Sequence, residues 1–110
     1  MEVIPKELQI YVTQGGQAPF SEWLTSLHDA RARAKVRVRL DRIRLGNFGD
    51  CRGVGEGVQE LRIDYGPGYR VYFGQVGLTI VILLCGGEKS TQNKDIELAK
   101  QYWSDYRSRS

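Results

Sequence analysis

Cysteine and histidine are scarce in this chain of 110 residues, which contains two cysteines and one histidine. Small secreted domains that depend on disulfides usually carry more cysteines, so we expect Cys51 and Cys85 to be ordinary thiols. A metal site of the His/Cys kind needs more ligands than are present. We therefore expect no metal and no cofactor, and for His28 a solvent or capping role.

Long apolar runs are also lacking. The longest, residues 78–85, is broken only by Thr79 and falls far short of the roughly 20 residues of a membrane helix. The N-terminus has Glu2 and Pro5 where a secretory signal would have a basic start and an apolar run. No repeat or low-complexity tract is found. These absences predict one domain over residues 1–110 in a cytoplasmic protein that does not enter membranes.

Positive charge is concentrated in one segment, although the net charge is only +3. Residues 31–52 contain two acids, Asp41 and Asp50, against a much larger set of bases: Arg31, Arg33, Lys35, Arg37, Arg39, Arg42, Arg44 and Arg52. Such a density favours binding to a phosphate backbone or to an acidic protein. The alternative is a solvated helix face.

The first half of the chain predicts one strand and two helices. Residues 8–13 (LQIYVT) are rich in β-branched and aromatic residues and predict a strand that pairs at a sheet edge. A short helix is expected to begin near Pro19, because Phe20, Trp23, Leu24 and Leu27 recur at a spacing of three and four residues.

The segment at residues 30–45 fits two structures. Its strict alternation of apolar and basic residues (ARARAKVRVRL) is typical of a strand, but it is too long for one and is rich in good helix formers. We therefore predict a helix that ends before Gly46. Its inner stripe would be Ala32, Val36, Leu40 and Ile43. A second apolar stripe, Ala34, Val38 and Leu45, needs the first helix or another protein as its neighbour.

The second half predicts three strands and a helix. A glycine-spaced loop (GDCRGVGEGV) precedes strands at residues 58–65, 69–76 and 78–85, the last ended by Gly86 and Gly87. A helix capped by Ser90 or Thr91 would run to about Arg107, with an inner stripe of Ile96, Ala99, Trp103 and Tyr106. The prediction is an α+β fold, β-α-α-β-β-β-α, with a mainly antiparallel sheet and the helices on one face.

Residues 56–106 carry a resemblance to a known family. The pattern EL-R-IDYGPGYRVY, then the apolar strand, then GGEKSTQ resembles the HigB-type addiction module killer proteins of the RelE/ParE toxin superfamily. The resemblance implies that superfamily's fold, a twisted antiparallel sheet packed against N-terminal helices. It also implies the toxin of a type II toxin–antitoxin pair, with a helix-turn-helix antitoxin, the ribosome and mRNA as partners.

RelE-like members cut mRNA in the ribosomal A site without a metal, and the resemblance implies the same activity here. The 2′-hydroxyl attacks the adjacent phosphate, which requires a base, cations around the phosphorane and an acid. The resemblance places a phosphate-contacting arginine at Arg70 and a basic residue at Lys89. Arg62, in the neighbouring strand, falls on the same sheet face as Arg70 by strand alternation. Arg62, Arg70 and Lys89 are thus the predicted catalytic residues, and Arg37, Arg39, Arg44 and Arg52 the predicted RNA-binding residues.

Two features leave the chemistry open. RelE has a catalytic tyrosine shortly after the last basic position, whereas STQNKDIE has none; Tyr102 and Tyr106 come later and fit a core role equally well. Glu60 and Glu88 are the candidate bases, and each could instead pair with an arginine. The alternatives to a nuclease are a ParE-like inhibitor of DNA gyrase that is not an enzyme, and an inactive remnant of a mobile element.

Overall fold

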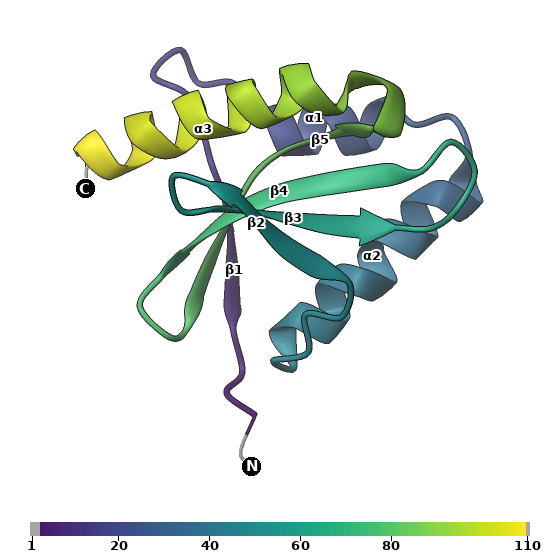
Figure 1. The fold of residues 1–110 in the computed structure, drawn as a ribbon, viewed down its shortest axis with the longest axis horizontal. Helices are drawn as coiled ribbons and strands as arrows, with labels where there is room; N and C mark the ends of the chain where they lie inside the picture. The colour runs from purple at the N-terminus through teal and green to yellow at the C-terminus, as the bar shows by residue number, and fades with distance from the viewer. Residues whose placement is uncertain (1–2, 110) are drawn as a thin grey trace.

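A computed structural model describes residues 3–109, which form an α+β fold of five strands, three α-helices and one 3-10 helix (Figure 1). The N-terminal half contains β1 (Glu7–Ile10), α1 (Pro19–Ser26) and α2 (Ala30–Arg44). The C-terminal half contains β2 (Cys51–Gly55), β3 (Val58–Ile63), β4 (Tyr69–Val76), β5 (Ile80–Glu88), η1 (Lys89–Thr91) and α3 (Gln92–Arg109).

The strands form one mixed sheet in the order β1-β5-β4-β3-β2. β1 pairs with β5 in parallel at one edge, and the remaining neighbours are antiparallel. The predicted edge position of the first strand and the β3-β4-β5 meander are therefore confirmed. β2 was predicted as a loop, which is wrong. The glycine-rich segment is a short edge strand, which pairs with β3 and is interrupted by a bulge between Gly53 and Gly55.

The sheet is covered on both faces, so the prediction of helices on one face is wrong. α1 and α2 pack on the face that carries Leu61, Val71 and Leu83. α3 lies across the opposite face, as Figure 1 shows. On that face Ala99 and Trp103 of α3 pack against strand side chains that point away from the α1 and α2 face: Val58, Tyr72, Ile82 and Leu84. The apolar run of β5 is explained by this double cover.

α2 is a helix, as predicted, and the side of it that packs on the sheet is apolar. Asp29 caps it, since its side chain accepts hydrogen bonds from the backbone of Arg31 and Ala32. Its buried residues are the four predicted for the inner stripe, Ala32, Val36, Leu40 and Ile43. The second stripe lies open, with Val38 48% and Leu45 71% exposed.

Both cysteines are free thiols, as predicted. Within residues 3–109, no helix is long and apolar enough to cross a membrane, and no group of three or more His, Cys, Asp and Glu residues is arranged to hold a metal ion.

Candidate functional site

Three arginines from three adjacent strands share the sheet face on which α3 lies. Arg52 in β2 is opposite Glu60 in β3, and Arg62 in β3 is directly opposite Arg70 in β4. Strand alternation places all of them on the side of Val58 and Tyr72. We call Arg52, Arg62 and Arg70 the arginine row. Its central pair, Arg62 and Arg70, was predicted from the hairpin pattern, and the register confirms that they share a face.

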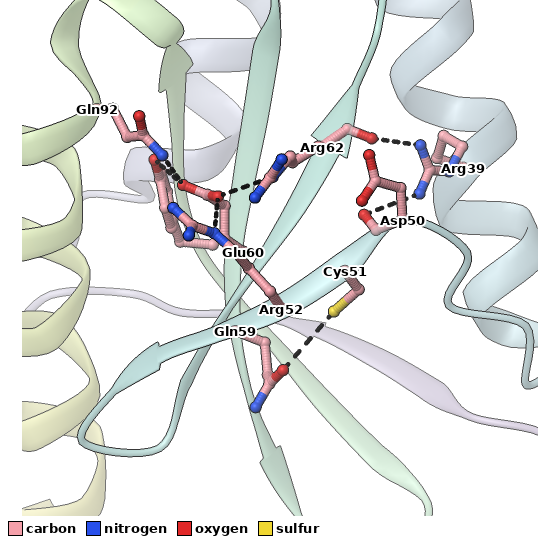
Figure 2. Close-up of polar contacts among 9 residues, drawn as sticks. Arg39, Asp50, Cys51, Arg52, Gln59, Glu60, Arg62 and Gln92 are labelled. Carbon is pink, nitrogen blue, oxygen red and sulfur yellow. Dashed lines mark hydrogen bonds and ion pairs between the residues drawn. The ribbon is translucent and has the colours of Figure 1, made fainter.

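Glu60 contacts two arginines of the row, Arg52 and Arg62, from a fully buried position (Figure 2). Its Oε1 lies 3.0 Å from Nε of Arg52 and 3.4 Å from Nε of Arg62. Its Oε2 accepts hydrogen bonds from the Tyr72 hydroxyl at 3.1 Å and from Nε2 of Gln92, at the start of α3, at 2.8 Å. One carboxylate thus joins β2, β3, β4 and α3.

The Glu60 carboxylate remains ionised in this setting. Burial alone would raise its pKa, but the hydrogen bonds from Gln92, Arg52 and Tyr72 together hold the pKa below its ordinary value. Burial, and then the negative charge of Glu60 and the hydrogen bond to it, raise the pKa of Tyr72. Because both Glu60 oxygens are engaged and none is exposed, we infer that Glu60 anchors the row and does not serve as a base for an external hydroxyl.

Arg70 is the least committed arginine of the row. Within residues 3–109 it forms no ion pair, and the buried Nε atoms of Arg62 and Arg70 both lack a hydrogen-bond partner. Arg62 has only the 3.4 Å approach to Glu60. Since the single buried carboxylate Glu60 approaches Arg52 and Arg62 but not Arg70, the opposed pair Arg62 and Arg70 leaves positive charge available for an anion.

Lys89 lies just beyond the same end of the sheet. It begins η1, its side chain is exposed, and its backbone N–H donates to the carbonyl of Gly68 in the β3–β4 turn at 2.8 Å. β5 continues through Gly86 and Gly87, which were predicted to end it. It can do so because Gly87 leaves space for the Asp95 carboxylate, which a Cβ at that position would displace.

The four predicted RNA-binding arginines do not form one surface. Arg52 belongs to the arginine row. Arg39 donates to the carbonyls of Arg62, Phe48 and Asp50, which braces α2 against β3 and the start of β2 (Figure 2). Arg44 pairs with Asp41 at 2.6 Å, and Arg37 is exposed on α2, on the other side of the sheet from the row.

The remaining candidate groups also separate. Glu88 is paired with Tyr69, so it points to the α1 face, away from Arg70. Tyr102 and Tyr106 pack in the core of the α3 face, against Tyr11 and Trp103.

Sequence reasoning missed Asp95. It lies against Gly87, the cross-strand partner of Arg70, and its Oδ2 accepts a hydrogen bond from the Thr91 hydroxyl at 2.5 Å. The signal was present in the sequence, since Gln92, Asp95 and Ile96 follow the spacing of a helix face turned toward the sheet.

Fold and site define a basic α+β protein with an arginine row on the sheet face that α3 crosses. Over 81 residues the chain is 54% identical to an uncharacterized protein of Haemophilus influenzae, an overlap that covers 74% of this chain and 82% of that protein. The chain belongs to the same family as the Haemophilus protein. No family model matches it.

Proposed function

We propose that the protein is a toxin of the RelE/ParE superfamily, of the HigB type, that cleaves mRNA on the ribosome in the cytoplasm. The observation that carries the proposal is the direct pairing of Arg62 with Arg70 on the α3 face, with Arg70 free of any ion pair in the described part of the chain. The mainly antiparallel sheet packed against α1 and α2 supports the assignment to the superfamily.

The proposed reaction is an internal transfer at one phosphodiester. The 2′-oxygen forms a bond to phosphorus, the bond from phosphorus to the 5′-oxygen breaks, and the products are a 2′,3′-cyclic phosphate and a 5′-hydroxyl. One proton leaves the 2′-hydroxyl and one is delivered to the departing 5′-oxygen. The pentavalent phosphorane carries additional negative charge, which fixed cations stabilise at little reorganisation cost.

The residues divide this work. Arg62 and Arg70 hold the non-bridging oxygens, since two adjacent guanidinium groups can grip one phosphate, and Lys89 supplies a third, mobile charge at the end of the sheet. We assign Asp95 the role of proton acceptor, because it is a carboxylate beside Gly87 on the face of Arg70. The ribosome contributes the alignment of the message.

A partner follows from the proposed activity. A toxin that stops translation has to be restrained, and we propose a small helix-turn-helix antitoxin as its cognate inhibitor. Acidic groups of that antitoxin would suppress activity by neutralising the arginine row.

The test is inducible expression together with cleavage mapping on ribosomes translating a defined message. Wild type should arrest growth and leave fragments with 5′-hydroxyl ends. Arg70→Ala combined with Lys89→Ala should abolish both effects while the far-ultraviolet circular dichroism spectrum stays unchanged. Lys94→Gln is the control for the loss of an exposed positive charge near the site, since Lys94 is exposed on the first turn of α3 and the substitution is expected to leave cleavage intact.

Other outcomes decide against the nuclease. Growth arrest without mRNA fragments, accompanied by loss of DNA supercoiling, would favour the gyrase inhibitor. Expression of folded protein without arrest would favour the inactive remnant. Full cleavage by Asp95→Asn would remove Asp95 from the mechanism and leave the cationic part standing.

A further inference from the structure

A groove of about 440 Å³ runs beside α2, on the side of that helix away from its buried stripe. Ala34, Val38 and Ile63 give it an apolar floor. Arg31, Lys35 and Arg42 line its rim. None of these residues belongs to the arginine row.

The apolar floor continues along the helix beyond the groove. Ala34 and Val38, together with Leu45, the C-cap residue of α2, lie within about 40° of one another at about 100° per residue and cover about 16 Å along the helix axis. Val38 is 48% and Leu45 71% exposed. The stripe is thus about three turns long, which matches the contact face of a short amphipathic helix with anchors at positions i, i+4 and i+11.

The rim carries charge that the protein does not neutralise. In the described residues, neither Arg31 nor Arg42 forms an ion pair, and Lys35 lies over the Tyr65 ring at 5.5 Å. Asp64 is the acid that lines the groove. Arg39 also lines the groove, with its guanidinium group donating to backbone carbonyls. Four cations against one carboxylate, beside an aliphatic floor, fit a partner surface with the opposite arrangement.

We propose that the α2 groove binds an acidic amphipathic helix of a partner protein. A second copy of this chain is disfavoured, because two α2 surfaces face to face would bring the same cations together. A nucleic acid is disfavoured, because the floor is aliphatic and Tyr65, the ring at its margin, is already covered by Lys35. The proposal is independent of the nuclease activity, since it depends on a different surface.

The probe is a displayed library of 14-residue helices with Leu or Ile at positions 1, 5, 8 and 12, and Glu, Lys, Gln or Ser elsewhere. Selection on the wild-type chain should enrich sequences rich in Glu. A synthetic peptide of the enriched sequence should then bind with a Kd that Val38→Asp weakens at least tenfold, and Arg42→Glu should act in the same direction. Leu78→Asp is the matched control, because Leu78 is 70% exposed on the turn between β4 and β5 and should not change the Kd.

Three results would overturn the proposal. The first is enrichment of basic or neutral helices, or no enrichment above that on the Val38→Asp chain. The second is equal weakening by Val38→Asp and Leu78→Asp. The third is occupation of the groove by something else, seen as a dimer, or as binding of an RNA oligonucleotide, that Val38→Asp abolishes. Chemical-shift mapping with the enriched peptide tests the location, since a groove-bound peptide moves the amide signals of α2 and a peptide bound elsewhere leaves them in place.

Discussion

Replacing Glu60 by glutamine tests the anchoring role of this carboxylate most directly. Glutamine keeps the size of the side chain and one acceptor oxygen, but it removes the charge that Arg52 and Arg62 share. Its NH2 group would also face hydrogen-bond donors, either the two arginines or the Tyr72 hydroxyl and Gln92 amide. A charge-assisted hydrogen bond contributes about 1.5–3 kcal/mol, and breaking a buried network costs about 3–5 kcal/mol. Both arginines are partly exposed, which reduces these figures.

We therefore expect Glu60→Gln to lower the free energy of unfolding by about 2–4 kcal/mol at pH 7. For a domain of this size that corresponds to a fall in Tm of about 10–20 °C. Thermal unfolding followed by circular dichroism measures it. Glu97→Gln is the control, since Glu97 is an exposed glutamate of α3 and its substitution should change the free energy of unfolding by less than about 0.5 kcal/mol.

The pH dependence supplies a second measurement on the same pair. The folded pKa of Glu60 lies below the unfolded value of 4.5, so its stabilisation is complete above about pH 4.5 and is lost as the pH falls through the folded pKa. The difference in Tm between wild type and Glu60→Gln should therefore shrink on acidification below pH 4.5. A difference in unfolding free energy under about 0.5 kcal/mol at pH 7, or a difference in Tm that grows with acidity, would refute the anchoring role.

Two further predictions concern the core. Gly74→Ala should lower the free energy of unfolding by about 1–3 kcal/mol, because its Cβ would lie 2.6 Å from the buried Trp103 ring. Gly53→Ala is the control and should be close to neutral, since its nearest neighbour would be Nε2 of Gln59 at 3.6 Å. A urea titration measures both, and equal losses would refute the packing argument. Cys85 should resist alkylation at pH 8 in the folded protein, because burial and then the Asp95 charge raise its pKa to about 12, which leaves about one thiolate in 10⁴; labelling in the native state, located by mass spectrometry, would contradict this.

The helices were predictable because their apolar spacing decides between competing structures. In α2, alternation favours a strand, but Ala32, Val36, Leu40 and Ile43 fall on one helical stripe, and these four residues are buried. β2 was missed because CRGVG has no apolar alternation; it forms because β3 offers it a free edge. The run of apolar residues in β5 indicated the position of α3, because a strand that is apolar on both sides needs packing on both faces of the sheet.

The candidate site was predictable only in part. The pairing of Arg62 with Arg70 follows from a short hairpin and strict alternation, both visible in the sequence. The burial of Glu60 does not, because it depends on an amide from α3, a hydroxyl from β4 and a guanidinium from an edge strand that was not foreseen. Arg39 was misleading for a similar reason, since a lysine- and arginine-rich helix gives no sign of which cation will bind backbone carbonyls.

The parallel pairing of β1 with β5 sets the order in which the molecule can be completed during its synthesis. Glu7–Ile10 leaves the ribosome about 70 residues before its partners, which are Ile80, Val81, Ile82 and Leu83. Until those residues emerge, β1 has no neighbouring strand. The Tyr11 hydroxyl gains its hydrogen-bond acceptor, Asp105, later still. A polypeptide interrupted before β5 therefore lacks this edge of the sheet and the helix α3 that covers one of its faces, so the fold is complete only after both segments have been synthesised.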